Sequence, residues 1–235
     1  MIENKLINLK KKGFLKLDNV DLDVLNLLGK KIKLAFDRAL KLVNEQDLTN
    51  EKLNHFIKRV DRGSLDLNCL SDSENLSLDL IKNLEIIEIA KEYWNSKKIK
   101  YSRSHSKFRH VDPLNNKQTK YSPLHYDGTF LNHNNSINIC IPFTGYGGDY
   151  PGLQIFPESK NFFKKKIIQK TQRFSFVNYF VNSFNPIVEK GSYICFNQNV
   201  YHRRTIQNCK KTRVNLEFRI FPEYTNDKNL DLDFI

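Results

Sequence analysis

The sequence predicts an α+β domain in which helices come first and antiparallel strands follow. Up to about residue 98 the apolar residues recur at helical spacing, whereas from Ile99 onward they alternate with polar residues. The chain has 235 residues, of which 40% are hydrophobic, and this is enough for one domain with a sizeable core. We therefore expect a single domain over 1–235, mainly helical over 1–98 and mainly built of strands over 99–235.

Helical periodicity in the first part of the chain predicts a series of helices. Gly13 is placed to end the first of them, and a short strand over 14–17 follows it. The Asp61-Arg62-Gly63-Ser64 cluster ends the third. The predicted helices cover 3–12, 21–44, 50–60 and 77–94.

Two later segments alternate strictly between apolar and polar residues, which is typical of half-buried strands. They are 136–143 and 213–220. We expect their apolar faces to pack on the N-terminal helices. Their polar faces would then line the interior of the sheet structure.

Composition narrows the classes of function. The net charge of +12 could attract an anionic partner, but no recognised nucleic-acid-binding motif is present, so we interpret the charge as a Lys-rich surface and expect no nucleic-acid partner. No apolar run is long enough to span a membrane, and the first residues lack the apolar core of a secretory signal. The four cysteines are scattered and form no Cys-x-x-Cys pair, so we expect a cytoplasmic protein.

One short motif suggests a metal site. His125 and Asp127 are two residues apart, so in an extended segment their side chains point to the same side. With His202 as a third ligand they would form the facial triad of two histidines and one carboxylate that is typical of non-haem Fe(II) oxygenases. By itself, a His-x-Asp motif is more often a structural hydrogen-bonding pair than a metal site.

The order of the elements around this motif resembles that of a known family. His125-Tyr126-Asp127 is followed by a turn-like stretch from Gly152 to Lys160, then by Gly191-Ser192, His202 and Arg213. This order resembles the phytanoyl-CoA dioxygenase-like family of Fe(II)/2-oxoglutarate-dependent oxygenases. Lys160 departs from it, because the family usually has histidine there. The resemblance implies a double-stranded β-helix, a cupin-like jelly roll, packed against the N-terminal helices.

The resemblance also implies an activity and its cofactors. The enzyme would use Fe(II), O2 and 2-oxoglutarate as cosubstrate to hydroxylate a small, possibly anionic, metabolite at an unactivated C–H bond. Arg213, eleven residues after His202, matches the family position that binds the distal carboxylate of 2-oxoglutarate. Asn138 and Tyr121 are further candidates for binding this cosubstrate.

One hypothesis concerns the residues that would bind the primary substrate. If 99–109 is a single strand, Arg103 and His105 share a face just before the metal ligands. They would bind an anionic group of the substrate, and Arg203 or Arg204, beside His202, would add to the attractive field. The alternative is an exposed edge strand whose basic residues prevent edge-to-edge pairing.

Two other classes of function remain open. One is a cupin-type metal-binding protein that does not use 2-oxoglutarate, against which the position of Arg213 argues. The other is a non-catalytic jelly-roll binding module, against which the presence of all three ligands argues. The identity of the substrate and the oligomeric state do not follow from the sequence.

Overall fold

The computed structural model describes residues 2–45, 64–66, 71–114, 124–129, 131, 135–157, 182–205 and 208–235. Its helices are α1 (Ile2–Lys12), α2 (Leu22–Glu45), α4 (Ser71–Lys82), α5 (Glu85–Trp94) and the short 3-10 helix η2 (Asp127–Thr129). Its strands are β1 (Phe14–Leu17), β2 (Ser64–Asp66), β3 (Ile99–Ser102), β4 (Lys107–Val111), β5 (Ile137–Pro142), β6 (Gly152–Phe156), β7 (Tyr193–Asn197), β8 (Tyr201–Thr205), β9 (Arg213–Pro222) and β10 (Leu232–Phe234).

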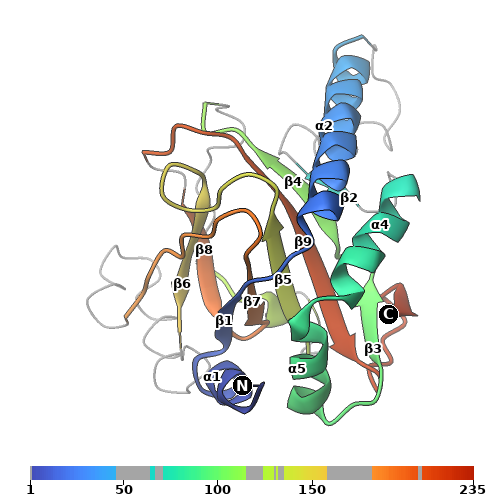
Figure 1. The fold of residues 1–235 in the computed structure, drawn as a ribbon, viewed down its shortest axis with the longest axis vertical. Helices are drawn as coiled ribbons and strands as arrows, with labels where there is room; N and C mark the ends of the chain where they lie inside the picture. The colour runs from blue at the N-terminus through green and yellow to red at the C-terminus, as the bar shows by residue number, and fades with distance from the viewer. Residues whose placement is uncertain are drawn as a thin grey trace.

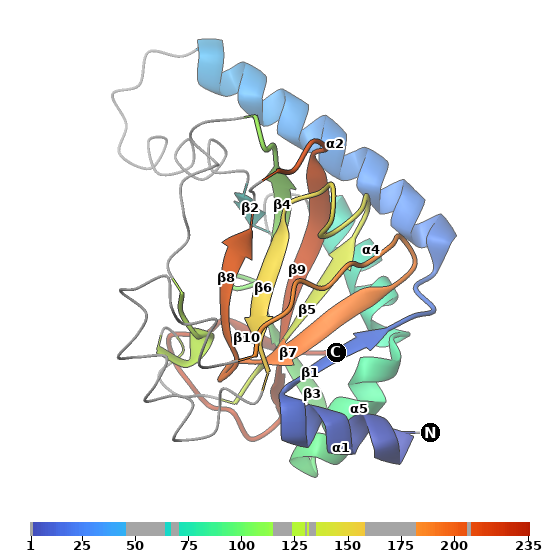
Figure 2. The same cartoon turned by 90° about the vertical axis from the view of Figure 1, so that its left-hand side faces the viewer.

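The described strands form a large and a small antiparallel sheet. The large sheet has the order β1-β7-β5-β9-β3-β10, and β4 also pairs with β9 and carries β2 on its other edge. β9 is the long central strand, since it pairs with β5 along one edge and with both β3 and β4 along the other. The small sheet consists of β6 and β8 (Figures 1 and 2).

One face of the large sheet, here called the helix face, packs against the helices. Its apolar residues join those of α2, α4 and α5 in one buried cluster, and Figure 1 shows these three helices on the same side of β9. Ile139 on β5 and Phe218 on β9 are completely buried there. The expected packing of the apolar strand faces on the N-terminal helices is therefore confirmed. From the sheet the cluster includes Ile137, Ile139, Ile141, Leu216, Phe218 and Ile220.

The opposite face of the large sheet, here called the inner face, looks toward the small sheet. Cys140 on β5, Ile194 and Phe196 on β7, and Ile155 on β6 form a second buried cluster, which holds the two sheets together. Over 213–220 the inner-face side chains of β9 are polar, as the alternation predicts: Arg213, Asn215, Glu217 and Arg219. Two sheets packed face to face behind a layer of helices are compatible with the expected jelly roll, which stays a prediction.

The structure confirms the predicted helices at 3–12 and 21–44 and the predicted strand at 14–17. The prediction of one continuous helix over 77–94 is wrong. The chain breaks at Leu84, which is extended (φ −78°, ψ 137°) and buried in the core, so α4 and α5 are separate helices. The Tyr193 hydroxyl accepts a hydrogen bond from the backbone N–H of Ile86 in the first turn of α5, at 3.2 Å. A contact from β7 thus supports a helix start that no local capping residue marks.

The single strand expected over 99–109 is also wrong. Between β3 and β4 the chain makes a turn in which the Asp231 carboxylate accepts hydrogen bonds from the Ser102 hydroxyl (2.7 Å) and the Ser104 backbone N–H (2.9 Å). The Ser106 hydroxyl donates to the carbonyl of Ser102 at 2.7 Å. These bonds replace those of a continuous ladder, because small hydroxyl side chains offer the backbone local partners.

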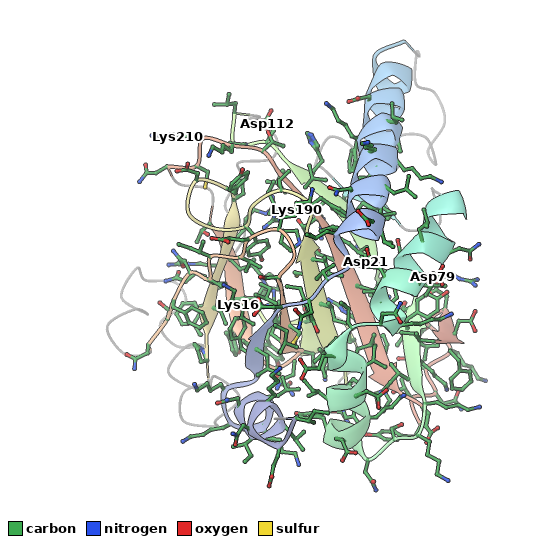
Figure 3. All side chains as sticks on the ribbon, viewed as in Figure 1. Lys16, Asp21, Asp79, Asp112, Lys190 and Lys210 are labelled. Carbon is green, nitrogen blue, oxygen red and sulfur yellow. The ribbon has the colours of Figure 1, made fainter. Side chains whose placement is uncertain are left out.

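The remaining predictions about the fold concern individual segments of the chain. The helix at 50–60 lies outside the described residues, as do Tyr121 and Lys160. Gly152–Phe156 forms strand β6 rather than a turn, and Gly191 forms the expected turn before β7 with φ +94°. Within the part of the chain that the structure describes, no helix has the length and apolar character needed to cross a bilayer. Charged side chains on the outside, such as those of Lys16, Asp79 and Lys210, are exposed (Figure 3).

Candidate metal centre

His125 and His202 are brought together by the backbone. His202 lies on β8, and His125 forms an isolated antiparallel bridge with it. The His125 N–H donates to the carbonyl of His202 at 3.0 Å, and the His202 N–H donates to the carbonyl of His125 at 2.9 Å. Asp127 follows at the first position of η2. The pairing therefore fixes the positions of two ligands that are 77 residues apart in the sequence.

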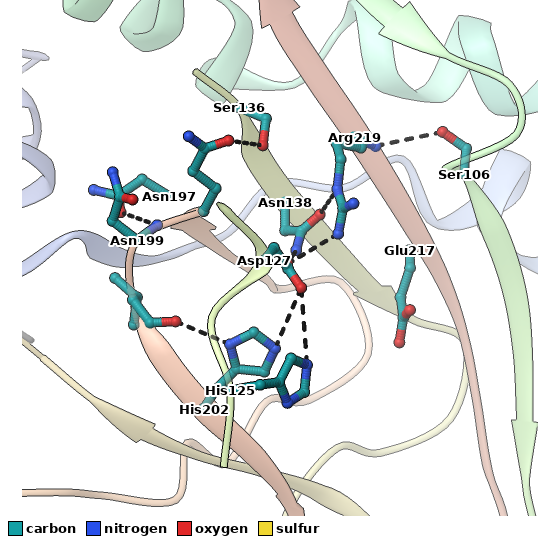
Figure 4. A network of polar contacts seen from close by, with 12 residues as sticks. Ser106, His125, Asp127, Ser136, Asn138, Asn197, Asn199, His202, Glu217 and Arg219 are labelled. Carbon is teal, nitrogen blue, oxygen red and sulfur yellow. Dashed lines mark hydrogen bonds and ion pairs between the residues drawn. The ribbon is translucent and has the colours of Figure 1, made fainter. Parts of the chain in front are cut away.

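The three side chains converge on one point. Nε2 of His125 lies 3.8 Å from Oδ1 of Asp127, and Nε2 of His202 lies 4.0 Å from the same oxygen. One ligand atom from each residue lies within 4.8 Å of the others, so the group could hold a metal ion (Figure 4). Asp127 and His202 are buried and His125 is partly exposed, which leaves one open side. The sequence therefore predicted the three members of this cluster.

The protonation of the ligands suits metal binding. The Nδ1 side of the His202 ring lies 3.0 Å from the carbonyl of Val200, so Nδ1 donates and Nε2 keeps its lone pair. Burial lowers the pKa of His202 although Asp127 raises it, which favours the neutral imidazole. For Asp127, burial raises the pKa, but Arg219 above all and then the two imidazoles and Asn138 lower it below its ordinary value.

The second oxygen of Asp127 is held by two residues. Oδ2 accepts hydrogen bonds from Nη2 of Arg219 at 2.9 Å and from Nδ2 of Asn138. Nε of Arg219 also donates to Oδ1 of Asn138 at 2.6 Å, so the three side chains form a closed ring of contacts (Figure 4). We call Arg219 and Asn138 the carboxylate clamp. It occupies Oδ2 and leaves Oδ1 facing the two imidazoles.

Sequence reasoning missed Arg219 and gave Asn138 a different role. The structure places Asn138 on a metal ligand, and the prediction that it binds 2-oxoglutarate stays untested. The register makes the clamp possible, because Asn138 and Arg219 are directly opposite each other on β5 and β9. The alternation of β9 placed Arg219 on the polar face, but only the strand pairing shows which residue it meets.

Arg213 is almost completely buried near the start of β9. It is 2% exposed, its Nη1 donates to the carbonyl of Pro151 at 3.2 Å, and its guanidinium lies 4.7 Å from the ring centre of Tyr146. Among the described residues, its buried Nε has no hydrogen-bond partner, and neither have the two buried polar atoms of the Asn215 amide. Buried polar atoms without partners are rare, and here they stand two positions apart on one face of one strand. They mark a place where a polar ligand would find donors.

Further charges surround this part of the inner face. Nε of Arg109 on β4 lies 2.9 Å from Oε2 of Glu217 on β9. Burial raises the pKa of Glu217, but Arg109 and then Arg213 outweigh it and bring this pKa down to about 2. Burial and the neighbouring charges of Arg213 and Arg109 lower the pKa of Arg204 to about 10.

The residues that we expected to bind a substrate anion do not share one strand. Arg103 lies near the C-terminal strand, where its side chain is 44% exposed and its Nη2 lies 3.0 Å from the carboxylate of Asp233. Nδ1 of His105 lies 3.0 Å from the Ser102 hydroxyl, and burial, followed by Arg219 and Lys107, lowers the His105 pKa. Arg204 is on β8, two residues beyond His202 and therefore on the same face. The pairing of Arg103 and His105 relied on the continuous strand that the structure lacks.

No family model matches this sequence, and neither does any curated protein. Solved structures do match. AviO1 from Streptomyces viridochromogenes Tue57 matches with a TM-score of 0.67 and 12% identity, over 97% of both chains. EctD from S. alaskensis, solved with 2-oxoglutarate and 5-hydroxyectoine, matches with a TM-score of 0.66 and 10% identity, over 93% of this chain and 75% of that one.

A third match is SnoN, a non-haem α-ketoglutarate-dependent epimerase from nogalamycin biosynthesis. Its TM-score is 0.59 at 10% identity, over 94% of this chain and 82% of the other. At such low identities the matches establish the fold, and the assignment to the phytanoyl-CoA dioxygenase-like family stays a prediction. The chain thus has the fold of non-haem iron, 2-oxoglutarate-dependent enzymes, with two histidines and an aspartate gathered at one point of it.

Proposed function

We propose that this protein is an Fe(II)- and 2-oxoglutarate-dependent oxygenase that hydroxylates a small molecule. The observation that carries the proposal is the convergence of His125, Asp127 and His202, with only one oxygen of Asp127 facing the imidazoles. Two neutral imidazoles and one carboxylate oxygen form the facial ligand set that suits Fe(II) and leaves positions open for other ligands. Solved neighbours with this fold carry 2-oxoglutarate or are described as dependent on it.

The clamp supports this ligand set physically. A carboxylate with two available oxygens can bind a metal through both, and it would then fill a position that an oxygenase needs for cosubstrate or O2. Arg219 and Asn138 occupy Oδ2, so Asp127 presents Oδ1 alone. The residues present therefore fit an iron centre with one-oxygen carboxylate ligation.

The inner face also fits 2-oxoglutarate. Its distal carboxylate would accept hydrogen bonds from Arg213 and Asn215, because the buried Arg213 Nε and the buried Asn215 amide have no partner within the part of the chain that the structure describes. When bound there, 2-oxoglutarate would supply two of the four electrons that reduce O2, the other two coming from the substrate C–H bond, and it would be converted to succinate and CO2. The protein binds and orients both reactants, and the burial of Asp127 and His202 keeps water from the ligand atoms.

Hydroxylation is the finer part of the proposal. Enzymes with this fold include an epimerase and a carbocyclase, so the fold is compatible with other oxidative outcomes. Asp127 is present in this chain, which argues against halogenation, because the halide would need the position that this carboxylate takes. Mass spectrometry of products from a metabolite panel distinguishes the outcomes: hydroxylation adds one oxygen atom, whereas epimerisation leaves the mass unchanged.

The decisive experiment is an anaerobic titration. Fe(II)-loaded protein titrated with 2-oxoglutarate should develop the visible absorption band of an iron–2-oxoglutarate chelate, and O2 should then yield succinate. His202→Ala should lose the band and the succinate while remaining folded by circular dichroism. Arg213→Gln should bind iron normally but 2-oxoglutarate at least about tenfold more weakly, because it loses a charge-assisted pair. Arg103→Gln, which changes a half-exposed arginine beside Asp233, is the matched control.

Other results would select the alternatives. Tight iron binding in the wild type without the chelate band or succinate would indicate a cupin-type metal-binding protein. Absence of metal binding would indicate a non-catalytic module. Full activity in His202→Ala would refute the assignment of the ligands.

A further inference from the structure

A pocket of about 470 Å³ lies between α2 and the ends of several strands, away from the candidate metal centre. On the side of α2 its lining includes Leu25, Gly29 and Lys33, which are four residues apart and therefore lie on one side of the helix. The rest of the lining comes from β4, from the start of β9 and from the turns beside the strands. The volume is within the range of pockets that bind small molecules.

Strand β9 separates this pocket from the inner face. Val214 lines the pocket and packs against the core on the helix face. Its neighbours Arg213 and Asn215 point to the opposite side of the sheet, because side chains alternate along a strand. A ligand in the pocket would therefore not occupy the place that the proposed function assigns to 2-oxoglutarate.

Part of the lining is apolar. Leu25 on α2 is completely buried, and Phe143, which follows β5, is 7% exposed. Gly29 allows the Phe143 ring to lie close to the helix, because a Cβ at position 29 would be only 3.3 Å from Cδ1 of Phe143. Glycine within a helix costs roughly 0.5–1 kcal/mol relative to alanine. The lining thus offers an apolar body a surface on which it would be removed from water.

The lining also contains three lysines and, among the described residues, no carboxylate. Lys30 and Lys33 belong to α2, and Lys190 lies in the turn before β7. The Lys190 ammonium donates a hydrogen bond to the side-chain oxygen of Asn26, which brings this turn against α2 (Figure 3). Within the described ranges, none of the three lysines forms an ion pair with a carboxylate. Their charges are therefore available to an anion in the pocket.

Two carboxylates act on the pocket without lining it. Asp37 and Asp112 raise the pKa of His110, whose side chain is half-buried at the pocket, but burial outweighs them and lowers this pKa. The imidazole is therefore mostly neutral at pH 7 and can exchange hydrogen bonds with a ligand. The lysines supply the positive charge of the lining.

We propose that this pocket binds a small amphipathic anion, in which one carboxylate, phosphate or sulfonate group is joined to an apolar body. Lys30, Lys33 and Lys190 would attract the anionic group, and the surface of Leu25 and Phe143 would receive the body. A concave lining of this size suits a small molecule better than a flat anionic surface. The inference goes beyond the proposed function and does not depend on it, because the two sites lie on opposite faces of the sheet.

The test uses the full chain and the fluorescent probe 8-anilinonaphthalene-1-sulfonate, whose emission rises when it enters an apolar pocket. The control ligand is N-phenyl-1-naphthylamine, which has the same ring system without the sulfonate. We expect saturable binding of the anionic probe to the wild type, at least about fivefold tighter than that of the neutral one. Saturating Ni(II) and 2-oxoglutarate should leave this affinity unchanged, because they would occupy the inner face.

Two kinds of variant separate charge from volume. The double variant Lys30→Gln/Lys33→Gln should bind the anionic probe at least about fivefold more weakly and the neutral probe as the wild type does. Lys11→Gln/Lys31→Gln removes the same charge from α1 and α2 outside the pocket lining, and this matched control should bind both probes normally. Val214→Phe reduces the volume without changing the charge and should weaken the binding of both probes.

Several outcomes would overturn the inference. They are the absence of saturable binding to the wild type, equal binding to the wild type and Lys30→Gln/Lys33→Gln, and an equal loss in Lys11→Gln/Lys31→Gln, which would mean that overall charge attracts the probe. Displacement of the probe by Ni(II) and 2-oxoglutarate would also overturn it, because the probe would then lie on the inner face. If Val214→Phe fails to fold by circular dichroism, the lysine variants still decide.

Discussion

The two faces of the large sheet differ in the kind of side chain that they bury. On the helix face, Ile139, Phe218 and their neighbours are apolar, buried and packed against α2, α4 and α5. On the inner face, the same strands present Asn138, Arg213 and Arg219, with charged groups in contact and with buried amide atoms that have no partner among the described residues. Burial of apolar area stabilises a fold, whereas buried charge and unpaired polar atoms cost stability. The comparison indicates that one face stabilises the fold, whereas the other carries the candidate metal cluster at a cost in stability.

The largest expected effect is a difference between the two faces in how far a substitution lowers the free energy of unfolding. Phe218→Ala should lower the free energy of unfolding by about 3–5 kcal/mol, because it leaves a cavity in the core on the helix face. Asn215→Ala, three positions earlier on the inner face, should change it by less than about 1 kcal/mol, because it also removes two buried polar atoms that have no partner in the described ranges. Urea denaturation of the metal-free protein measures both. Equal losses would mean that the two faces do not differ in this way.

The second prediction concerns the carboxylate clamp. Arg219→Met should weaken metal binding by about 10–100-fold, the usual effect of removing a residue that orients a ligand. Competition with a chelator of known affinity measures this loss. Arg103→Met removes a half-exposed arginine that pairs with Asp233, and it should leave the metal affinity unchanged. Unchanged affinity in Arg219→Met would show that Asn138 alone suffices to hold Asp127.

The smallest expected effect is on the pH dependence of stability. The pKa of Glu217 is depressed to about 2 from an ordinary 4.5, so its pairing with Arg109 contributes stability above pH 4.5 and loses it as the pH falls toward 2. Arg109→Gln should therefore cost about 1–2 kcal/mol at pH 7, between the values for exposed and buried pairs, and progressively less below pH 4.5. Urea denaturation at pH 7 and pH 3 measures the change.

A matched control is available on the surface. Lys211 lies 3.2 Å from Asp149, but both side chains are more than half exposed, so Lys211→Gln should cost less than about 0.5 kcal/mol. If Arg109→Gln costs no more than Lys211→Gln at pH 7, the inner-face pair contributes no more than a surface pair does.

The sequence by itself determined the elements with strong periodicity and the three members of the candidate metal cluster. Helix α2 and strands β5 and β9 follow from the spacing of their apolar residues, because side-chain direction repeats with a fixed period in each. His125, Asp127 and His202 were predicted because a metal needs those atom types, and because their order along the chain resembles that of a family.

Only the tertiary structure decided which polar residues meet. The register between β5 and β9 places Asn138 opposite Arg219 and so forms the clamp on Asp127, which no spacing along the sequence could show. Likewise, Asp231, more than 120 residues downstream of Ser104, breaks the strand expected over 99–109 by binding that turn. The physical reason is the same in both cases: local periodicity fixes the face on which a side chain lies, and pairing between distant segments fixes its partner.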